Sequence, residues 1–283
     1  MTLRNASDTF DIGGELTVHR LGYGALRITG EDVIGEPDDV ENAERVLQTA
    51  VSLGVDFIDT ADSYGPGVSE RLIREALSPY ADDLVIATKG GLLRNREGEW
   101  LKRGDPDSLR NALLCSLDRL GVDCIDLYQY HRVDPDADFE ESVTALAELK
   151  DDGEIRHIGL SNVSVEQLET AREIVDIATV QNQYNLANRE SEAVLDVCES
   201  AGIGFIPWFP LGAGDLGSKA GVLSTVADAH DASKYQVALA WLLQHSPVIL
   251  PIPGTSSVAH LRENVAASHL ELTADEMRRL DGQ

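Results

Sequence analysis

Short hydrophobic runs rich in β-branched and aromatic residues recur along the chain, separated by longer amphipathic stretches. Each run is bounded by glycine, proline or polar residues, as strands commonly are. Eight such runs predict β-strands, at residues 21–26, 55–60, 84–89, 125–131, 155–161, 178–183, 202–208 and 247–252.

The stretches between these runs have the periodicity of helices. Residues 38–54 space their apolar side chains by three and four, which places them on one helical face. Residues 105–121 carry a proline near the start, where the first helical turn favours it. These two stretches and residues 137–153 end in glycines that commonly stop a helix, at Gly54, Gly121 and Gly153.

Strand and helix alternate along the whole chain, which indicates βα units and an α/β fold. Eight strands predict a closed (β/α)8 TIM barrel, with an open doubly wound sheet as the alternative. The stretch 10–20, FDIGGELTVHR, has Gly13-Gly14 between alternating segments and predicts an N-terminal β-hairpin that plugs the barrel floor. No linker or low-complexity segment is found, so residues 1–283 are expected to form one barrel domain.

The charge balance is strongly acidic, with 49 Asp and Glu against 23 Lys and Arg and a formal net charge of −26. Such a surface repels phosphate, so nucleic acid is not expected as a partner. In molar salt the screening length falls to about 3 Å and this self-repulsion largely vanishes. We therefore hypothesise a halophilic protein, and an ordinary acidic cytosolic protein is the alternative. Lysine is also scarce, at positions Lys89, Lys102, Lys150, Lys219 and Lys234.

The sequence predicts a cytoplasmic protein without a membrane segment. No apolar run reaches the roughly 18 residues that a membrane helix needs, and the first residues do not resemble a secretory signal. Cys115, Cys124 and Cys198 are odd in number and lack C-x-x-C spacing. We expect them to be buried, reduced thiols that form neither a disulfide framework nor a zinc site.

The stretch FIDTADSYGPG, residues 57–67, runs from an apolar strand directly into polar residues that include Asp59 and Tyr64. The next two predicted strands end in Lys89 and His131. In a (β/α)8 barrel the carboxyl ends of all strands meet at one mouth, where active sites lie. A single histidine at such a position is more often structural, but four complementary ionisable groups favour catalysis.

The four residues resemble the catalytic tetrad of the aldo-keto reductase superfamily, which implies the reduction of a carbonyl group, and their chemistry agrees with that function. Hydride addition to a carbonyl leaves an alkoxide that needs a proton, and a free tyrosine, with a pKa of about 10, is a weak acid at pH 7. A lysine cation about 4 Å away would lower the phenol pKa by roughly three units. Asp59 would keep Lys89 charged and in place, and His131 would orient the carbonyl oxygen.

The motifs of the chain resemble those of the aldo-keto reductase superfamily, in that family's order and over nearly the whole length. They are FIDTADSYG, IATKGG, YQYHR, HIGLSN, VQNQYN, PWFPLG and IPGTSSVAHLRENV. The resemblance implies an NAD(P)H-dependent reductase of aldehydes and ketones, of a bacterial type that includes pyridoxal reductases. It implies a catalytic tetrad with Tyr64 as the proton donor, made of Asp59, Tyr64, Lys89 and His131. The expected partner is a small-molecule carbonyl substrate, and the expected state is a monomer or weak homo-oligomer.

The same resemblance implies a binding site for NADPH, with NADH as the alternative cofactor. The implied residues lie at the ends of the last four strands and in the following helix: Ser161, Asn162, Gln183, Trp208, Pro210, Leu211, Gly212, Gly254, Thr255, Ser256, His260, Glu263 and Asn264. The loop after the last strand has no lysine, and His260 stands where the family often has arginine. We therefore expect a preference for NADPH that is weaker than an arginine would give.

Several other classes of enzyme lack their motifs in this chain. No tyrosine belongs to the Y-x-x-x-K pair that a short-chain dehydrogenase needs, and the GYG at 22–24 lacks the third glycine of a Rossmann fingerprint. The histidines never have the H-x-H spacing of a metal-dependent barrel hydrolase, so zinc is not expected. A cofactor-binding regulatory subunit with weak turnover remains an alternative.

Residues 92–106 predict either a solvated connection or a substrate loop in which Arg94 and Trp100 face the carbonyl compound. Trp241 is expected to pack in the core.

Overall fold

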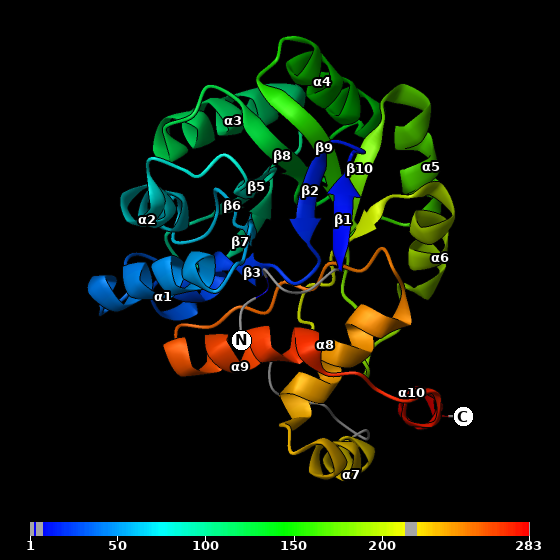
Figure 1. Ribbon diagram of the computed structural model, residues 1–283. Coiled ribbons are helices and arrows are strands. Elements are labelled where there is room, and N and C mark those ends of the chain that lie inside the picture. Colours follow the sequence, from blue (N-terminus) through cyan, green and yellow to red (C-terminus); the bar gives the residue numbers. More distant parts are fainter. Residues whose placement is uncertain (1–2, 4–7, 213–219, 283) are drawn as a thin grey trace.

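Parallel strands surrounded by helices make up most of the structure, a computed structural model that describes residues 3, 8–212 and 220–282. Within these residues one parallel sheet has the strand order β11-β10-β9-β8-β5-β4-β3. Its members in chain order are β3 (Tyr23–Gly24), β4 (Phe57–Asp59), β5 (Val85–Gly90), β8 (Ile125–Tyr130), β9 (Ile155–Ser161), β10 (Ile177–Gln181) and β11 (Gly204–Phe205). The sheet curls around a central axis, and the predicted (β/α)8 barrel is confirmed (Figure 1).

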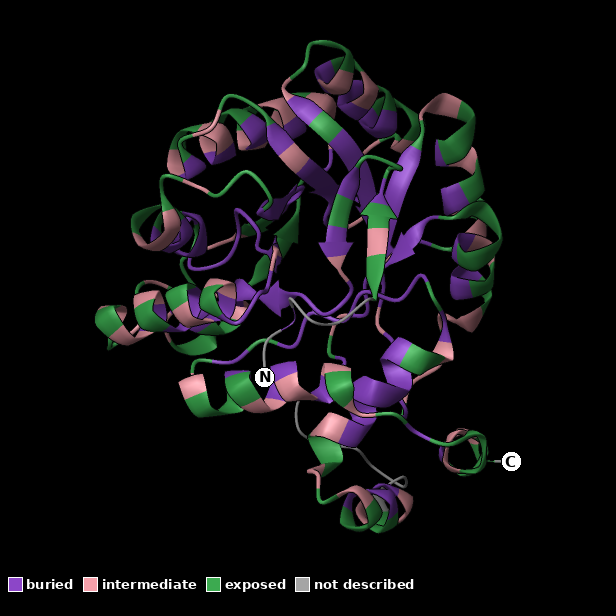
Figure 2. Ribbon diagram, viewed as in Figure 1, coloured by how far each residue is buried: buried purple, intermediate pink, exposed green. Residues whose placement is uncertain are grey.

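Helices surround the sheet, with buried residues facing the strands and exposed residues facing outward (Figure 2). The α-helices are α1 (Val40–Ser52), α2 (Val68–Leu77), α3 (Pro106–Leu120), α4 (Phe139–Asp151), α5 (Val165–Ile174), α6 (Glu192–Ala201), α7 (Ala220–His230), α8 (Lys234–His245), α9 (Val258–Ala266) and α10 (Ala274–Asp281). Short 3-10 turns form η2 (Ala25–Ile28), η3 (Glu31–Val33) and η6 (Ala267–His269). Aspartate carboxylates cap three of the predicted helices by accepting free backbone N–H groups, at Asp39, Asp105 and Asp138.

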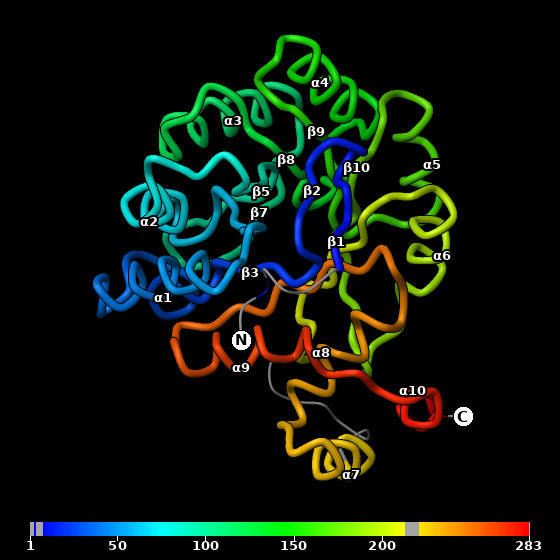
Figure 3. The backbone as a smooth tube through the Cα atoms, in the orientation of Figure 1, coloured from blue at the N-terminus to red at the C-terminus, as the bar shows by residue number. Residues whose placement is uncertain are grey.

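The barrel closes through residues 248–252, which occupy the place of an eighth strand without forming a regular one. Phe205 in β11 donates its backbone N–H to the carbonyl of Val248 at 2.8 Å, and Gly22 donates to that of Pro251 at 3.0 Å. The segment can be followed in orange beside the blue β3 in Figure 3. Because Pro251 has no N–H, the ladder of hydrogen bonds cannot continue through it.

Two glycines make this closure possible. A Cβ atom on Gly24 would lie 2.7 Å from the carbonyl oxygen of Ile252, and one on Gly254 would lie 2.7 Å from that of Gly24. Any larger residue at either position would push the first strand away from the closing segment. Gly254, expected from the sequence to contact a cofactor, therefore also has a structural role.

Several predicted strands are shorter than expected, and residues 247–252 do not form a regular strand. β10 ends at Gln181, two residues before the predicted end at Gln183, and β11 contains only Gly204–Phe205 of the predicted 202–208. Pro207 cannot donate to a ladder, which explains why β11 stops before it. The first five predicted strands each overlap an observed strand, and 155–161 is matched at both ends.

The N-terminal hairpin forms as predicted from β1 (Thr9–Ile12) and β2 (Leu16–His19), with positive φ angles of 62° and 77° at Gly13 and Gly14. Ile12, Leu16 and Val18 belong to one apolar cluster with inward-facing residues of the barrel. The backbone N–H of His19 donates to Asp56, immediately before β4, at 2.9 Å. The hairpin thus closes the end of the barrel where the strands begin, as Figure 1 also shows.

A second hairpin lies in the stretch that the sequence left as either a connection or a substrate loop. β6 (Leu92–Arg94) pairs antiparallel with β7 (Trp100–Lys102), immediately after β5. Short strands with mostly exposed side chains lack the hydrophobic alternation that would have predicted them.

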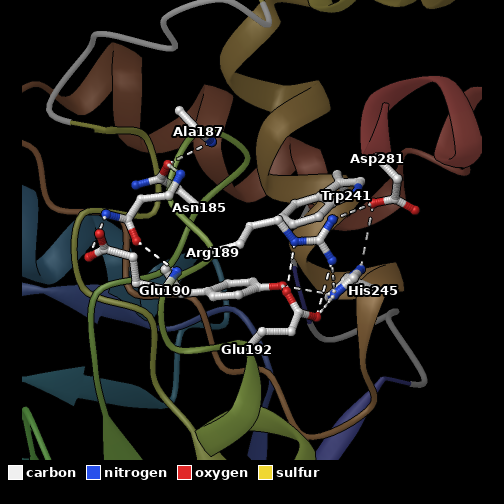
Figure 4. Close-up of polar contacts among 10 residues, drawn as sticks. Asn185, Ala187, Arg189, Glu190, Glu192, Trp241, His245 and Asp281 are labelled. Carbon is white, nitrogen blue, oxygen red and sulfur yellow. Dashed lines mark hydrogen bonds and ion pairs between the residues drawn. The ribbon is translucent and has the colours of Figure 1, made fainter. Parts of the chain in front are cut away.

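A polar cluster anchors the C-terminal helix α10 to α6 and α8 (Figure 4). Arg189 donates to Glu192 at 2.7 Å and to Asp281 at 3.1 Å, and the indole N–H of Trp241 also donates to Asp281 at 3.1 Å. The ring of His245 stacks on Trp241 with centroids 4.6 Å apart. Trp241 is fully buried, so the expectation that it packs in the core is confirmed.

Two further expectations concern membranes and thiols. In the described part of the chain, no helix is both long and apolar enough to cross a membrane. All three cysteines are free, but only Cys198 is buried, whereas Cys115 is half-buried and Cys124 is exposed. The expectation of three buried thiols is therefore wrong, because Cys124 lies in the turn between α3 and β8 and not on a helix face.

Candidate active site

The four predicted catalytic side chains meet at the carboxyl ends of β4, β5 and β8. Lys89 in β5 donates from Nζ to Asp59 Oδ2 at 2.6 Å and to the carbonyl of Thr60 at 2.7 Å. The same Nζ lies 5.2 Å from the ring centroid of Tyr64. The rings of Tyr64 and His131 meet edge to face, with centroids 5.9 Å apart. The expected convergence of these residues is thus present in the structure.

The Asp59–Lys89 pair is buried deep beneath the barrel mouth, and two glutamines complete its hydrogen bonding. Lys89 is 0% exposed and Asp59 is 2% exposed. Gln129 and Gln181 donate their amide N–H groups to Asp59 Oδ1 at 2.9 and 2.8 Å. Both carboxylate oxygens therefore have donors, which a buried charge requires. Sequence reasoning missed both glutamines, although each lies on a strand that was predicted.

Burial and the ion pair act in opposite directions on the proton of Tyr64. Burial raises the pKa of Tyr64 above its usual value of 10 and outweighs the lowering by Lys89, while Asp59 adds a smaller increase. The expectation that Lys89 brings the phenol pKa well below 10 is therefore wrong. The main reason is that the phenol is removed from water, and the negative charge of Asp59 adds to the effect.

His131 is held in its neutral form. Burial lowers its pKa well below the usual 6.5, and the cations of Lys89 and Arg132 lower it further. Its Nδ1 lies 3.4 Å from the hydroxyl of Ser63, and its backbone N–H donates to Gly90 at 2.9 Å. A neutral imidazole and a protonated phenol can both donate a hydrogen bond to an oxygen atom that comes within reach of them.

A cavity of about 550 Å³ opens above these groups. Its wall includes three of the four predicted catalytic side chains, those of Asp59, Tyr64 and His131. The other lining residues come from around the barrel mouth: Gly24, Leu26, Arg27, Leu92, Trp100, Lys102, Arg132, Ser161, Asn162, Gln181, Trp208, Phe209, Pro210, Leu211, Ile252, Pro253 and Gly254. This size suits a small organic molecule. Trp100 lines the cavity but Arg94 does not, so only the first of these two expected substrate contacts is at the site. Arg94 instead stacks on Trp100, with its guanidinium carbon 3.8 Å from the ring centroid.

The side chains of Asn162 and Trp208 are locked together at the wall of this cavity. Trp208 donates its indole N–H to Asn162 Oδ1 at 2.9 Å, and Asn162 Nδ2 donates to the Ser161 hydroxyl at 2.7 Å. Asn162 has a positive φ of 59°, a conformation that asparagine tolerates better than most residues. Gln181 uses its amide nitrogen toward Asp59, which leaves its amide oxygen able to accept a hydrogen bond from a bound molecule.

The remaining residues implied for the cofactor are divided between the cavity and its surroundings. Ser161, Asn162, Trp208, Pro210, Leu211 and Gly254 line the cavity, whereas Gln181 takes the wall position that was expected for the half-buried Gln183. Other implied residues lie outside the wall, and their role stays a prediction: Gly212, Thr255, Ser256, His260, Glu263 and Asn264. Several of these belong to the start of α9, where the Ser257 hydroxyl accepts the backbone N–H of His260 at 3.4 Å.

Three cations at the cavity were not expected from the sequence. Arg27, Lys102 and Arg132 all line it, and no ion pair or side-chain hydrogen bond of theirs is found among the described residues. Within the same part of the chain, no group of three or more His, Cys, Asp or Glu side chains is arranged to hold a metal ion.

Comparison with known proteins places this geometry in a family. A sequence model of the "Aldo/keto reductase family" matches residues 20–283. An uncharacterised oxidoreductase of Schizosaccharomyces pombe is 48% identical over 95% of this chain and 87% of its own length. Pyridoxine 4-dehydrogenase of Escherichia coli is 46% identical over 98% of each chain. The crystal structure of an aldo/keto reductase from Klebsiella pneumoniae in complex with NADP and acetate has a TM-score of 0.81 and 26% identity, over 97% of this chain and 94% of the other. The chain therefore belongs to the aldo/keto reductase family.

Proposed function

We propose that this protein is an NADPH-dependent oxidoreductase that reduces aldehydes or ketones to alcohols, with Tyr64 as the proton donor. The observation that carries the proposal is the buried Lys89–Asp59 pair, with Lys89 Nζ 5.2 Å from the Tyr64 ring and neutral His131 beside that ring. In the product alcohol, the carbonyl carbon has gained a hydride and the oxygen has gained a proton. The chain's own groups account for the proton.

The residues at the cavity fit a nicotinamide cofactor. Bound NADPH would supply the hydride, and the related Klebsiella protein is known with NADP. Asn162, Gln181 and Ser161 offer amide and hydroxyl groups for a carboxamide, and Trp208 offers an aromatic surface. Arg27 lies beside Gly254, with its Cγ 3.6 Å from where a Cβ of that glycine would be, and offers a cation to phosphate groups.

Tyr64 and His131 would act on the carbonyl oxygen as paired neutral donors. The raised pKa of Tyr64 keeps the phenol protonated at neutral pH, so it is ready to donate. The lowered pKa of His131 keeps the imidazole neutral, so it can orient the oxygen without competing for the proton.

Lys89 would stabilise the phenolate that Tyr64 becomes after the transfer. Burial alone would lower the pKa of Lys89, but Asp59 and Tyr64 more than offset this, and the lysine pKa is raised overall. A positive charge is thus held beside the position where negative charge develops, which is the arrangement that lowers a barrier most effectively.

Aromatic aldehydes are the substrate class that we propose to examine first. Trp100, Trp208 and Phe209 give the cavity three aromatic side chains. One relative carries the name pyridoxine 4-dehydrogenase. A flat aromatic ring would pack against these side chains while its aldehyde approaches Tyr64.

The proposal is tested by NADPH oxidation with a panel of aldehydes, ketones and pyridoxal in molar salt. Turnover with at least one aldehyde, absent without enzyme, is the expected result. Stoichiometric NADPH binding without turnover would favour the alternative, a cofactor-sensing regulatory subunit. Michaelis constants for NADPH and NADH in the same assay test the cofactor choice, and His260→Arg should widen the preference for NADPH. Equal use of both cofactors by the wild type would contradict the assignment of NADPH as the preferred cofactor, but not the proposed reductase activity.

A further inference from the structure

The charges at the cavity are opposite to those of the protein as a whole. The chain has about two acidic residues for each basic one. Around the cavity, by contrast, Arg27, Lys102 and Arg132 face a single carboxylate, that of Asp59. Since Asp59 is already paired with Lys89, the three other cations are not neutralised by the wall. A negative ligand would therefore find its main electrostatic attraction at this mouth.

Arg132 and Lys102 line the cavity from the loop after β8 and from the β6–β7 hairpin, respectively. Arg132 follows His131 directly and lines the same cavity as Tyr64. Its guanidinium carbon lies 5.5 Å from the ring centroid of Trp208. Lys102 ends β7 and faces the same cavity from the hairpin. Arg27, in contrast, lies beside Gly254 at the closing segment, where the phosphates of the cofactor are proposed to bind.

The two loops that carry these cations are fixed to one another. The backbone N–H of Gly104 donates to the Asp134 carboxylate at 3.0 Å, and the hydroxyl of Ser142 donates to the Gly104 carbonyl at 2.7 Å. The backbone N–H of Asp134 in turn donates to the hydroxyl of Tyr130 at 3.1 Å. The end of the hairpin is thus tied to the loop after β8 by buried hydrogen bonds, so Lys102 and Arg132 are presented to the cavity together.

We propose that Arg132 and Lys102 form a subsite for a negatively charged oxygen group, so that the preferred substrates are aldehydes or ketones that also carry a carboxylate or phosphate. This rests on the proposed function, because it concerns the far end of the molecule whose carbonyl meets Tyr64. The planar guanidinium of Arg132 suits two oxygens of one anionic group, and Lys102 adds a point charge. The aromatic side chains that line the same cavity would hold the ring that connects carbonyl and anion.

The test compares two aldehydes that differ in one charge, 4-carboxybenzaldehyde and its neutral methyl ester. For the wild type we expect kcat/KM to favour the carboxylate by about tenfold or more, since a charge-assisted hydrogen bond is typically worth that factor. Pyridoxal 5′-phosphate against pyridoxal is the phosphate arm, and the larger of the two ratios identifies the anion. Raising the salt concentration should reduce the preference.

Substitutions identify the residues responsible. Arg132→Gln should bring the ratio of the two kcat/KM values close to one, while Lys102→Gln, on an exposed side chain, should reduce it about threefold. Arg103→Gln is the matched control, because it removes one positive charge next to Lys102 from a residue outside the cavity wall, and it should leave the ratio unchanged. If Arg132→Gln loses all turnover, quenching of tryptophan fluorescence by 4-(hydroxymethyl)benzoate measures binding directly and should be weaker than in the wild type.

The outcomes separate the two proposals. If no compound of the panel, these aldehydes included, is reduced, the proposed function fails. If both aldehydes of each pair are reduced equally well by the wild type, the enzyme assignment stands and the anion subsite is wrong. An equal loss of preference in Arg103→Gln would also overturn it, because a general effect of net charge would then explain the result.

Discussion

Removing the buried lysine should destabilise the protein far more than removing the whole ion pair. Lys89→Met keeps most of the side-chain volume but takes away the cation that donates to Asp59 at 2.6 Å in a site that is 0% exposed at Lys89 and 2% at Asp59. Asp59 would keep only the amide donors of Gln129 and Gln181. Breaking one side of a buried pair typically costs about 3 to 5 kcal/mol. In a protein of this size that is on the order of 10 °C in melting temperature.

The double variant Asp59→Asn/Lys89→Met is the control for this reasoning. An asparagine oxygen can still accept from both glutamines, and no charge is left buried, so much of the lost stability should return. The assay is urea unfolding followed by circular dichroism in molar salt, with the two single variants and the double variant forming a cycle. A coupling energy of about 2 kcal/mol or more is expected. The reasoning is refuted if the free energy of unfolding of Lys89→Met lies within about 1 kcal/mol of the wild-type value, which is on the order of ordinary surface substitutions. It is also refuted if the double variant is no more stable than the Lys89→Met variant.

Three further predictions concern the pKa shifts, the charge and the barrel closure. The pKa of His131 is well below 6.5 and that of Tyr64 is raised, so the imidazole stays neutral and the phenol stays protonated near neutral pH. We expect kcat/KM for reduction to be constant from about pH 6.5 to 9 and to fall only as the phenol ionises. A change of slope near pH 7 in this profile would contradict the prediction. The net charge of −26 should make folding depend on salt, so circular dichroism and activity should both be lost on dialysis from molar to low salt; full activity at low salt would remove the support for a halophilic protein. Gly254→Ala should cost about 1 to 3 kcal/mol because its Cβ would lie 2.7 Å from the Gly24 carbonyl, whereas Gly221→Ala, with no atom within 4 Å, should be neutral in thermal unfolding; equal melting temperatures would show that the closing segment can move aside.

The sequence predicted the fold and the meeting of the four ionisable residues for the same physical reason. Asp59, Lys89 and His131 each stand at the end of an apolar run, and the carboxyl ends of parallel strands in a barrel share one mouth. Tyr64 follows in the turn whose glycines the sequence also displays, with positive φ angles of 72° at Gly65 and 77° at Gly67. Spacing along the chain was enough to place these groups.

The parts that were missed depend on which way a side chain faces and on what surrounds it. Gln129 and Gln181 lie inside predicted strands, and nothing in a strand pattern distinguishes an amide that faces a buried carboxylate from any other polar residue. Arg132 and Lys102 occur in polar stretches of the sequence, where most charges are solvated. The pKa of Tyr64 could not be predicted, because it is decided by a balance between burial and an ion pair that only the folded protein contains.

The central claim is that Tyr64 gives the proton to the carbonyl oxygen, and Tyr64→Phe tests it most directly. The variant keeps the ring that packs against His131 and removes only the hydroxyl. The measurement is the single-turnover rate of NADPH oxidation with a saturating aldehyde, together with the dissociation constant for NADPH from fluorescence. We expect the rate to fall by about 10² to 10⁴-fold, the usual contribution of a general acid, while NADPH binds with unchanged affinity. A rate close to that of the wild type would mean that another group supplies the proton.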